Sequence, residues 1–408
     1  MKPFELINRM IDLAEPGNFF NRQDLSVRSF GLGDNAVNFT GDNVAKFQEA
    51  IESLYAANRD VEHSYTFKEF EKRFASFFHD SLRNNTHIAK VEAKRFFDEL
   101  KSVPQIGYTV YRPIQGVHLK DDLKRTELGP YQIVHYPTLT DSFPKFGAEG
   151  QADLIWVGDT PRYLIGHKAT ARHQEKAIEI ADEAFTRFEQ IIRYLLGNIG
   201  DRFEVGILNY RGATLNKAYV FGPDRPAGSS SNLQGAYESI PLDDPFFINQ
   251  DAGHKTVWEI VDSSTSSEFK KRVLLALEWI AQAMNETSLA SGFIKAAIAL
   301  EILFTHNEKS IVTPSILSQI SENTALLLAD TTEDRIELEK EVKKLYSVRS
   351  SIVHAGKRDI LRDQYVRMLQ VSRGVVSTIL TRDDLLSLSK IEDLYMLLKG
   401  KKFSCGAI

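Results

Sequence analysis

The sequence predicts an α+β region followed by an all-helical bundle, and two observations support this division. Short β-rich segments alternate with helical patterns as far as residue 262, whereas helical periodicity alone continues beyond it. The small polar stretch DSSTSS at 262–267 separates the two patterns and is typical of a linker. We therefore expect an α+β region at 1–262, with room for two subdomains, and a helical domain at 263–408.

The composition is that of a soluble globular protein with two domains. The chain has 408 residues, of which 43% are hydrophobic and 26% are charged. A single cysteine, Cys405, excludes an intrachain disulfide and a cysteine metal cluster. No apolar run approaches the roughly 18–20 residues that span a bilayer, and the N-terminus lacks the apolar core of a signal peptide. We expect a cytoplasmic protein without a membrane partner.

The charge balance excludes a strongly basic nucleic-acid-binding domain. From residue 265 onward there are 20 Lys and Arg against 18 Asp and Glu, and before it there are 30 against 37. Proteins that bind nucleic acid through a global field carry a clear excess of Lys and Arg. Any RNA chemistry in this chain must therefore depend on a local site.

In the first region, amphipathic periodicity predicts helices and β-branched or aromatic runs predict strands. The helices are expected at 65–83, 89–102 and 173–197. The strands are expected at 106–114, 131–136, 152–158, 163–169, 204–210, 217–222 and 257–261. The stretch 222–232 is dense in Gly, Pro, Ser and Asp, which predicts a loop.

In the second region, capping residues mark the ends of six expected helices. These cover 268–286, 289–305, 314–329, 332–354, 360–381 and 383–399. Ser267 and Ser288 stand at the N-cap positions of the first two, and Pro314 opens the third after Thr313. Gly356 follows the fourth helix as a C-terminal stop. Short connections between six helices predict a compact bundle.

A charged residue interrupts the apolar stripe of the fourth helix. The stripe runs at spacings of three and four residues through Leu338, Val342, Leu345, position 349 and Ile352. Position 349 is Arg349, and a guanidinium on a core-facing stripe is costly unless it is paired. Glu301 lies within the apolar run AAIALEILF at 296–304, so we expect it to pair with or orient Arg349. The alternative is an ion pair that only holds the bundle together.

His354 follows Arg349 by five residues at the end of the same helix. Five steps of a helix leave the two side chains about 140° apart, so one helix does not place both on one face. An isologous dimer could bring two Arg349 and two His354 around one cleft. The same R-x4-6-H spacing recurs at Arg73, Arg112 and Arg162, so the spacing alone is weak evidence for a site.

The segment around Arg349 resembles a known family, the Apea-like HEPN domains. The run LYSVRSSIVHAG at 345–356 is similar to the family pattern L-Y-x-x-R-S-x-I-V-H-G, with Ala355 where glycine is usual. The run ALEIL at 299–303 matches the family's A-L-E-x-L element, and 315–328 resembles the helix between them. The resemblance covers about 100–140 residues of the C-terminal region and implies a HEPN-type helical bundle.

The resemblance implies a metal-independent endoribonuclease that works as a homodimer and needs no cofactor. Histidine titrates near neutral pH and suits acid–base work, which we assign to His354; the planar fork of Arg349 suits a phosphate in the transition state. Ser350 would hold a phosphate or orient the histidine, and Tyr346 would support Arg349 or only pack. The expected products end in a 2′,3′-cyclic phosphate and a 5′-hydroxyl.

Many such domains belong to bacterial anti-phage, abortive-infection or toxin systems. The substrate would be RNA, and residues 1–262 would form a sensor or regulatory region that answers a phage-derived or nucleotide trigger. Other members have lost catalysis, so a non-catalytic dimerisation or nucleotide-binding module with an N-terminal ligand- or protein-binding domain is the alternative.

A second nuclease pattern lies in the first region. Asp153, followed by Lys168 in YLIGHK, resembles the PD-(D/E)xK core, in which an aspartate and a second acid hold Mg²⁺ beside a lysine. Gly166 stands where the second acid belongs, so an ordinary β-hairpin is the simpler interpretation. The remaining histidines show no pair at metal-ligand spacing, and the sequence predicts no metal site.

Overall fold

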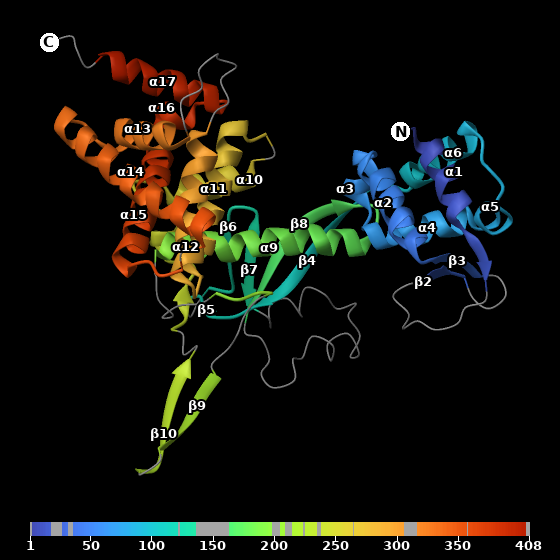
Figure 1. Ribbon diagram of the computed structural model, residues 1–408, viewed down its shortest axis with the longest axis horizontal. Helices are drawn as coiled ribbons and strands as arrows, with labels where there is room; N and C mark the ends of the chain where they lie inside the picture. Colours follow the sequence, from blue (N-terminus) through green and yellow to red (C-terminus); the bar gives the residue numbers. More distant parts are fainter. Residues whose placement is uncertain are drawn as a thin grey trace. The chain divides into compact units, whose positions relative to one another are not determined.

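The structure is a computed structural model that describes residues 2–17, 27–31, 36–120, 123–135, 163–197, 205–208, 214–222, 225–234, 238–263, 265–305, 316–356 and 358–404. It divides into two compact units (Figure 1). Unit 1 comprises Met1–Val110 and Lys168–Glu183, and unit 2 comprises Tyr111–His167 and Ala184–Ile408. The predicted α+β region followed by a mostly helical region is confirmed. The helical domain expected at 263–408 lies within unit 2, which also holds strands of a sheet.

Unit 1 combines small helices with a three-stranded antiparallel sheet of order β1-β3-β2. Its strands are β1 (Glu15–Gly17), β2 (Val27–Phe30) and β3 (Ala36–Thr40). Its helices are α1 (Pro3–Leu13), α2 (Asp42–Ala56), α3 (Arg59–Ser64), α4 (Phe67–Phe77), α5 (His79–Asn84) and α6 (Lys90–Ser102). The strand–helix alternation that the sequence indicates therefore begins earlier than residue 65.

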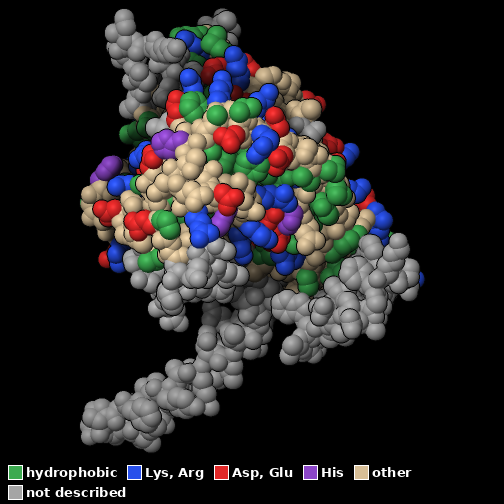
Figure 2. Space-filling model, turned by 90° about the vertical axis from the view of Figure 1, so that its right-hand side faces the viewer, with side chains coloured by type: hydrophobic (Ala, Val, Ile, Leu, Met, Phe, Trp, Pro, Cys, Tyr) green, Lys and Arg blue, Asp and Glu red, His purple; other side chains and the backbone are tan. Residues whose placement is uncertain are grey.

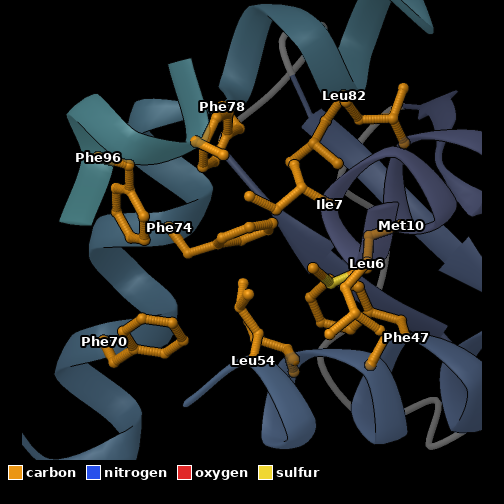
Figure 3. Packing of buried hydrophobic residues seen from close by; sticks show 14 of the residues in the cluster. Leu6, Ile7, Met10, Phe47, Leu54, Phe70, Phe74, Phe78, Leu82 and Phe96 are labelled. Carbon is orange, nitrogen blue, oxygen red and sulfur yellow. The ribbon is translucent and has the colours of Figure 1, made fainter. Parts of the chain in front are cut away.

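Phenylalanine rings and aliphatic side chains together form the core of unit 1 (Figure 3). Phe70, Phe74, Phe78 and Phe96 are buried, and the centroids of Phe74 and Phe78 lie 5.1 Å apart. The helix expected at 65–83 is interrupted at Phe78, whose backbone leaves the helical region while its ring stays in the core. Aromatic packing therefore overrides the continuous amphipathic period of this stretch.

The chain also forms a four-stranded sheet of order β4-β8-β7-β6. Its strands are β4 (Ile106–Ile114), β6 (Arg125–Leu128), β7 (Tyr131–His135) and β8 (Tyr163–Ala171). The short strands β5 (Val117–His118) and β11 (Ile240–Pro241) pair in parallel. The helix α9 (Gln174–Leu196) matches the expected 173–197. In unit 2 the ring of Tyr131 contacts Phe188 at a centroid distance of 5.0 Å, and its hydroxyl donates to the Ala184 carbonyl.

Three expectations for the first region are wrong. Residues 257–261 lie in a helix, α10 (His254–Asp262), because a short apolar run fits a buried helix as well as a strand. The expected loop at 222–232 is largely strand β10 (Arg225–Gln234), which pairs with β9 (Thr214–Gly222) so that backbone hydrogen bonds outweigh the turn-forming composition. In place of a strand at 204–210, only an isolated bridge between Gly206 and Gln115 lies among the described residues. The expected strand at 152–158 lies outside the described residues.

The helices of the second region follow the expected order (Figure 1). They are α11 (Glu268–Met284), α12 (Leu289–Phe304), α13 (Ile316–Leu328), α14 (Thr332–Ala355), α15 (Arg362–Thr381), α16 (Asp383–Leu386) and α17 (Ile391–Ser404). The side chains of Ser267 and Ser288 accept backbone N–H groups as predicted caps. Thr313 and Pro314 lie outside the described residues.

The last expected helix is wrong in one respect, because α16 and α17 replace a single helix at 383–399. The carboxylate of Asp393 accepts the N–H groups of Ser389 and Lys390, each at 3.1 Å. This local hydrogen bonding satisfies the start of α17 and competes with a continuous helix. Among the described helices, none is long and apolar enough to cross a membrane.

Candidate functional site

The helix α14 holds four of the five predicted site residues, and its two ends are fixed by local hydrogen bonds. At its start, the Thr331 hydroxyl accepts the N–H of Asp334 at 3.1 Å. At its end, Gly356 adopts a left-handed backbone with φ of 65°, and its N–H donates to the Ser351 carbonyl. Glycine has no Cβ and takes this conformation at little cost. The helix therefore ends at Ala355, one residue after His354.

The expected pairing of Arg349 with Glu301 is present. The Arg349 Nη2 atom lies 3.0 Å from Glu301 Oε1, and each side chain is about a quarter exposed. Glu301 projects from α12, which packs against α14. On the N-terminal side of Arg349 the stripe residues Val342 and Leu345 are buried, and on its C-terminal side Ile352 is half-buried. The guanidinium thus replaces an apolar side chain at the edge of the core and is neutralised there by a carboxylate from the neighbouring helix.

Tyr346 completes a three-residue cluster on the same carboxylate oxygen. Its hydroxyl donates to Glu301 Oε1 at 2.5 Å, and the Arg349 Cζ atom lies 5.9 Å from the centre of its ring. Burial and the hydrogen bond to Glu301 raise the pKa of the Tyr346 phenol well above its usual range. The phenol therefore stays protonated and acts as a donor. Tyr346 both packs and supports Arg349 through their shared partner.

Two buried polar atoms beside this cluster make no hydrogen bond among the described residues. They are Arg349 Nε and Thr305 Oγ1. Thr305 follows Glu301 by four residues at the end of α12, so both lie on one side of that helix. Unsatisfied buried donors are uncommon and are typical of strained or functional positions. The Arg349 guanidinium is therefore paired with Glu301, while Arg349 Nε and Thr305 Oγ1 have no hydrogen-bond partner among the described residues.

His354 and Ser350 lie on a different face of α14 from Arg349. Both are exposed, and as positions i and i+4 they are neighbours on the helix surface. Among the described residues, no hydrogen bond or ion pair joins Arg349 to His354. Within one protomer the structure therefore brings Arg349, Glu301 and Tyr346 together and leaves His354 and Ser350 facing solvent.

The surface charge is mixed. Figure 2 shows one face of the molecule, on which Lys and Arg side chains are interspersed with Asp and Glu. The helix α14 also carries both signs, as in the pair of Lys343 with Glu339 at 2.5 Å. This arrangement agrees with the near-neutral charge balance of the sequence.

The second nuclease pattern lacks the space for its missing acid. A Cβ atom at Gly166 would stand 2.5 Å from Tyr111 Cε1, which is far inside van der Waals contact. The Tyr111 hydroxyl donates to Gln132 at 2.8 Å and holds the ring in place. Asp153 lies outside the described residues. A carboxylate at position 166 would therefore have to displace Tyr111, and the first strand of the expected hairpin lies outside the described residues.

Sequence reasoning missed a cluster of possible metal ligands in unit 1. One donor atom each from Glu69, His173 and Glu175 lie within 4.8 Å of one another. Glu69 and His173 stand 104 positions apart, so no spacing in the sequence could indicate their approach. The only local signal was the pair of His173 and Glu175 at the start of a predicted helix.

Comparisons of the chain with models of protein families, with curated proteins and with solved structures found no match. The resemblance to HEPN domains therefore rests only on the motif residues of α12 and α14.

Proposed function

We propose that this protein is a metal-independent endoribonuclease of the HEPN type whose active site forms between two copies of the chain. The observation that carries the proposal is the arginine of an R-x4-H motif held by a carboxylate at the edge of the helical core. A purely structural apolar stripe would have no need of Arg349, Glu301 and Tyr346 at one point. The resemblance of 299–303 and 345–356 to the family supports the same assignment.

Each side chain has a defined role in the proposed reaction. The 2′-oxygen of RNA attacks the adjacent phosphorus, and the bond from phosphorus to the 5′-oxygen breaks. One His354 takes the proton of the 2′-hydroxyl, and the His354 of a second copy gives a proton to the leaving 5′-oxygen. Arg349 stabilises the negative charge on the phosphorane, and Ser350 hydrogen-bonds a phosphate oxygen beside His354. Glu301 and Tyr346 position Arg349.

A dimer follows from the separation of the two groups along α14. Arg349 and His354 are about 7.5 Å apart along the helix axis and point in different directions. A two-fold axis beside the exposed end of α14 would allow Arg349 of one copy to approach His354 of the other. The exposed Val353, 47% accessible, lies between them and would be covered in such an interface.

The cellular role that fits this activity is a defence or toxin effector. An RNA-cleaving enzyme damages its own host, so residues 1–262 would restrain it until a phage-derived or nucleotide trigger arrives. Induced expression of the wild type should reduce growth under phage challenge more than without it, whereas His354→Ala should not reduce growth in either condition.

The biochemical test is cleavage of RNA in the presence of EDTA, with chemical analysis of the new ends. The wild type should produce 2′,3′-cyclic phosphate and 5′-hydroxyl ends, and His354→Ala should produce none while its circular dichroism is unchanged. An RNA with a single 2′-deoxy position at the cut site should bind but stay intact. Retained cleavage by His354→Ala, or 3′-hydroxyl ends, would contradict the assignment. RNA binding without cleavage by the wild type would favour the non-catalytic module.

A further inference from the structure

Two carboxylates and one imidazole from distant parts of the chain meet within unit 1. Glu69 lies in the first turn of α4, His173 immediately precedes α9, and Glu175 lies in the first turn of α9. The His173 Nδ1 atom is 3.2 Å from Glu175 Oε2, and its Nε2 atom is 4.0 Å from Glu69 Oε1. One donor atom from each residue can be chosen so that all three lie within 4.8 Å of one another.

The backbone on both sides of this cluster is fixed by other contacts. The Thr66 hydroxyl accepts the N–H of Glu69 at 3.1 Å and caps α4. On the other side, Arg172 donates its backbone N–H to the Ser64 carbonyl and pairs with Asp60 at 3.0 Å. The residue before His173 is thus anchored on α3. The three side chains are brought together by the fold of unit 1, and a ligand would not have to organise them.

The three side chains of the cluster differ in their exposure to solvent. The exposed fraction of the side chain is 11% for Glu69, 28% for His173 and 57% for Glu175. The Nδ1 atom of His173 is buried and makes no hydrogen bond among the described residues, although Glu175 Oε2 lies 3.2 Å from it. A buried ring nitrogen without a partner is costly, and coordination to a metal ion would remove that cost.

We propose that Glu69, His173 and Glu175 form a binding site for a divalent transition metal ion, with Zn²⁺ as the best fit. Imidazole and carboxylate are common ligands of Zn²⁺, whereas Mg²⁺ and Ca²⁺ prefer oxygen ligands alone. Donor atoms around a tetrahedral zinc ion at 2.0–2.1 Å lie about 3.3 Å apart. The donor atoms would reach this separation on metal binding by rotation of both the His173 and the Glu175 side chains, which are 28% and 57% exposed. Three protein ligands leave a fourth position for water.

Two features set the strength of this site. Arg73 Nε lies 2.8 Å from Glu69 Oε1 and competes with the metal for that oxygen. Arg73 also lies 5.2 Å from the centre of the Tyr65 ring, which offers the guanidinium a second contact when the metal binds. The N-terminus of α9 carries partial positive charge, which opposes a cation. We therefore expect micromolar affinity for Zn²⁺ and no detectable binding of Mg²⁺.

A bound ion would join the start of α9 to α4 and stabilise the fold of unit 1. Binding to the native state alone raises the unfolding temperature in proportion to the logarithm of the free metal concentration. This site is separate from α14 and plays no part in the proposed RNA cleavage. Its existence therefore does not depend on that activity.

The test uses the full chain, freed of metal with EDTA and then dialysed, and Zn²⁺ or Co²⁺ as the probe. Calorimetry should give one Zn²⁺ per chain, and the visible absorption of bound Co²⁺ should report four- or five-fold coordination. His173→Ala and Glu175→Gln should each weaken binding at least tenfold. The matched control is His87→Ala, which removes an exposed imidazole that lies 2.6 Å from Asp12 in the same unit. It should bind zinc as the wild type does.

Three results would overturn the proposal. The first is a wild-type protein that binds no Zn²⁺, and the second is affinity that survives both His173→Ala and Glu175→Gln. The third is equal weakening by His87→Ala. Because Glu175 is more than half exposed, Glu175→Gln should fold normally and keeps the test decisive if His173→Ala does not fold. After any of these three results, Glu69, His173 and Glu175 would be a salt-bridge cluster without metal affinity.

Discussion

Glu301 and Arg349 face each other across α12 and α14 at 3.0 Å, and the same oxygen of Glu301 accepts the hydroxyl of Tyr346. One carboxylate thus sets the position of the guanidinium and of the phenol. The pair lies at the edge of the core, so it can contribute both to stability and to the presentation of Arg349. The predictions below separate these contributions.

Replacing Glu301 should reduce both stability and activity. We expect Glu301→Gln to lower the free energy of unfolding by about 1–2 kcal/mol, between the values for exposed and buried pairs, since both side chains are a quarter exposed. Urea denaturation of Glu301→Gln, Arg349→Met and the double variant measures the coupling between them. A coupling energy near zero would mean that the ion pair does not hold Arg349.

Replacing Tyr346 by phenylalanine should reduce the free energy of unfolding about as much as Glu301→Gln does. The ring and its packing remain, and the lost hydrogen bond to a charged acceptor costs about 1–2 kcal/mol. RNA cleavage should fall in proportion to the loss of order at Arg349, with little change in RNA binding. A Tyr346→Phe variant as inactive as Arg349→Ala would instead place the phenol in the reaction itself.

The raised pKa of Tyr346 predicts a dependence of stability on alkaline pH. Folding favours the protonated phenol, so its contribution is fully present below the usual value of 10.0 and is lost as the pH rises above it. The pKa values of several other tyrosines are also raised. The test must therefore use the difference in stability between the wild type and Tyr346→Phe. The stability gap between wild type and Tyr346→Phe should be constant from pH 6 to 9 and should narrow above pH 10. A gap that widens there would contradict the sign of the shift.

Gly356 should be required to end α14 after His354. Its φ of 65° is strained for a residue with Cβ, although no atom would meet that Cβ within 4 Å. We expect Gly356→Ala to cost about 1 kcal/mol and Gly356→Asn to cost less, because asparagine tolerates this conformation. Gly356→Ala should therefore lower the unfolding temperature and the rate of RNA cleavage more than Gly356→Asn does. An equal loss for both would show that the conformation is not the cause.

Much of the helical region could be predicted from the sequence because its signals are local. Ser267 and Ser288 cap α11 and α12, and Gly356 ends α14, each through bonds to residues three to five positions away. The pairing of Glu301 with Arg349 could also be predicted, because a charge on an apolar stripe requires a partner. The same reasoning did not separate α10 from a strand, since its apolar run is too short to show a period.

The rest depended on contacts between distant residues. The break at Phe78 follows from the packing of aromatic rings, and β10 is held by its pairing with β9 despite a composition typical of loops. The approach of Glu69 to His173 requires the fold of unit 1 and has no trace in the sequence. The approach of Arg349 to His354 of a second copy depends on how two chains assemble, so it stays a prediction.

The most direct measurement is complementation between two inactive variants. Arg349→Ala and His354→Ala are co-expressed with different tags, the mixed dimer is purified, and its cleavage of RNA in EDTA is compared with that of each variant alone. Arg367→Ala is the control, because it removes another arginine–glutamate pair, between Arg367 of α15 and Glu341 of α14, without changing a residue of the proposed site. We predict that both single variants are inactive and that Arg367→Ala is active. The mixed dimer holds one Arg349 and one His354, so it should regain part of the activity, with water in place of the second His354 as the proton donor to the leaving 5′-oxygen. Full activity of either single variant, or inactive Arg367→Ala with normal folding, would contradict the account.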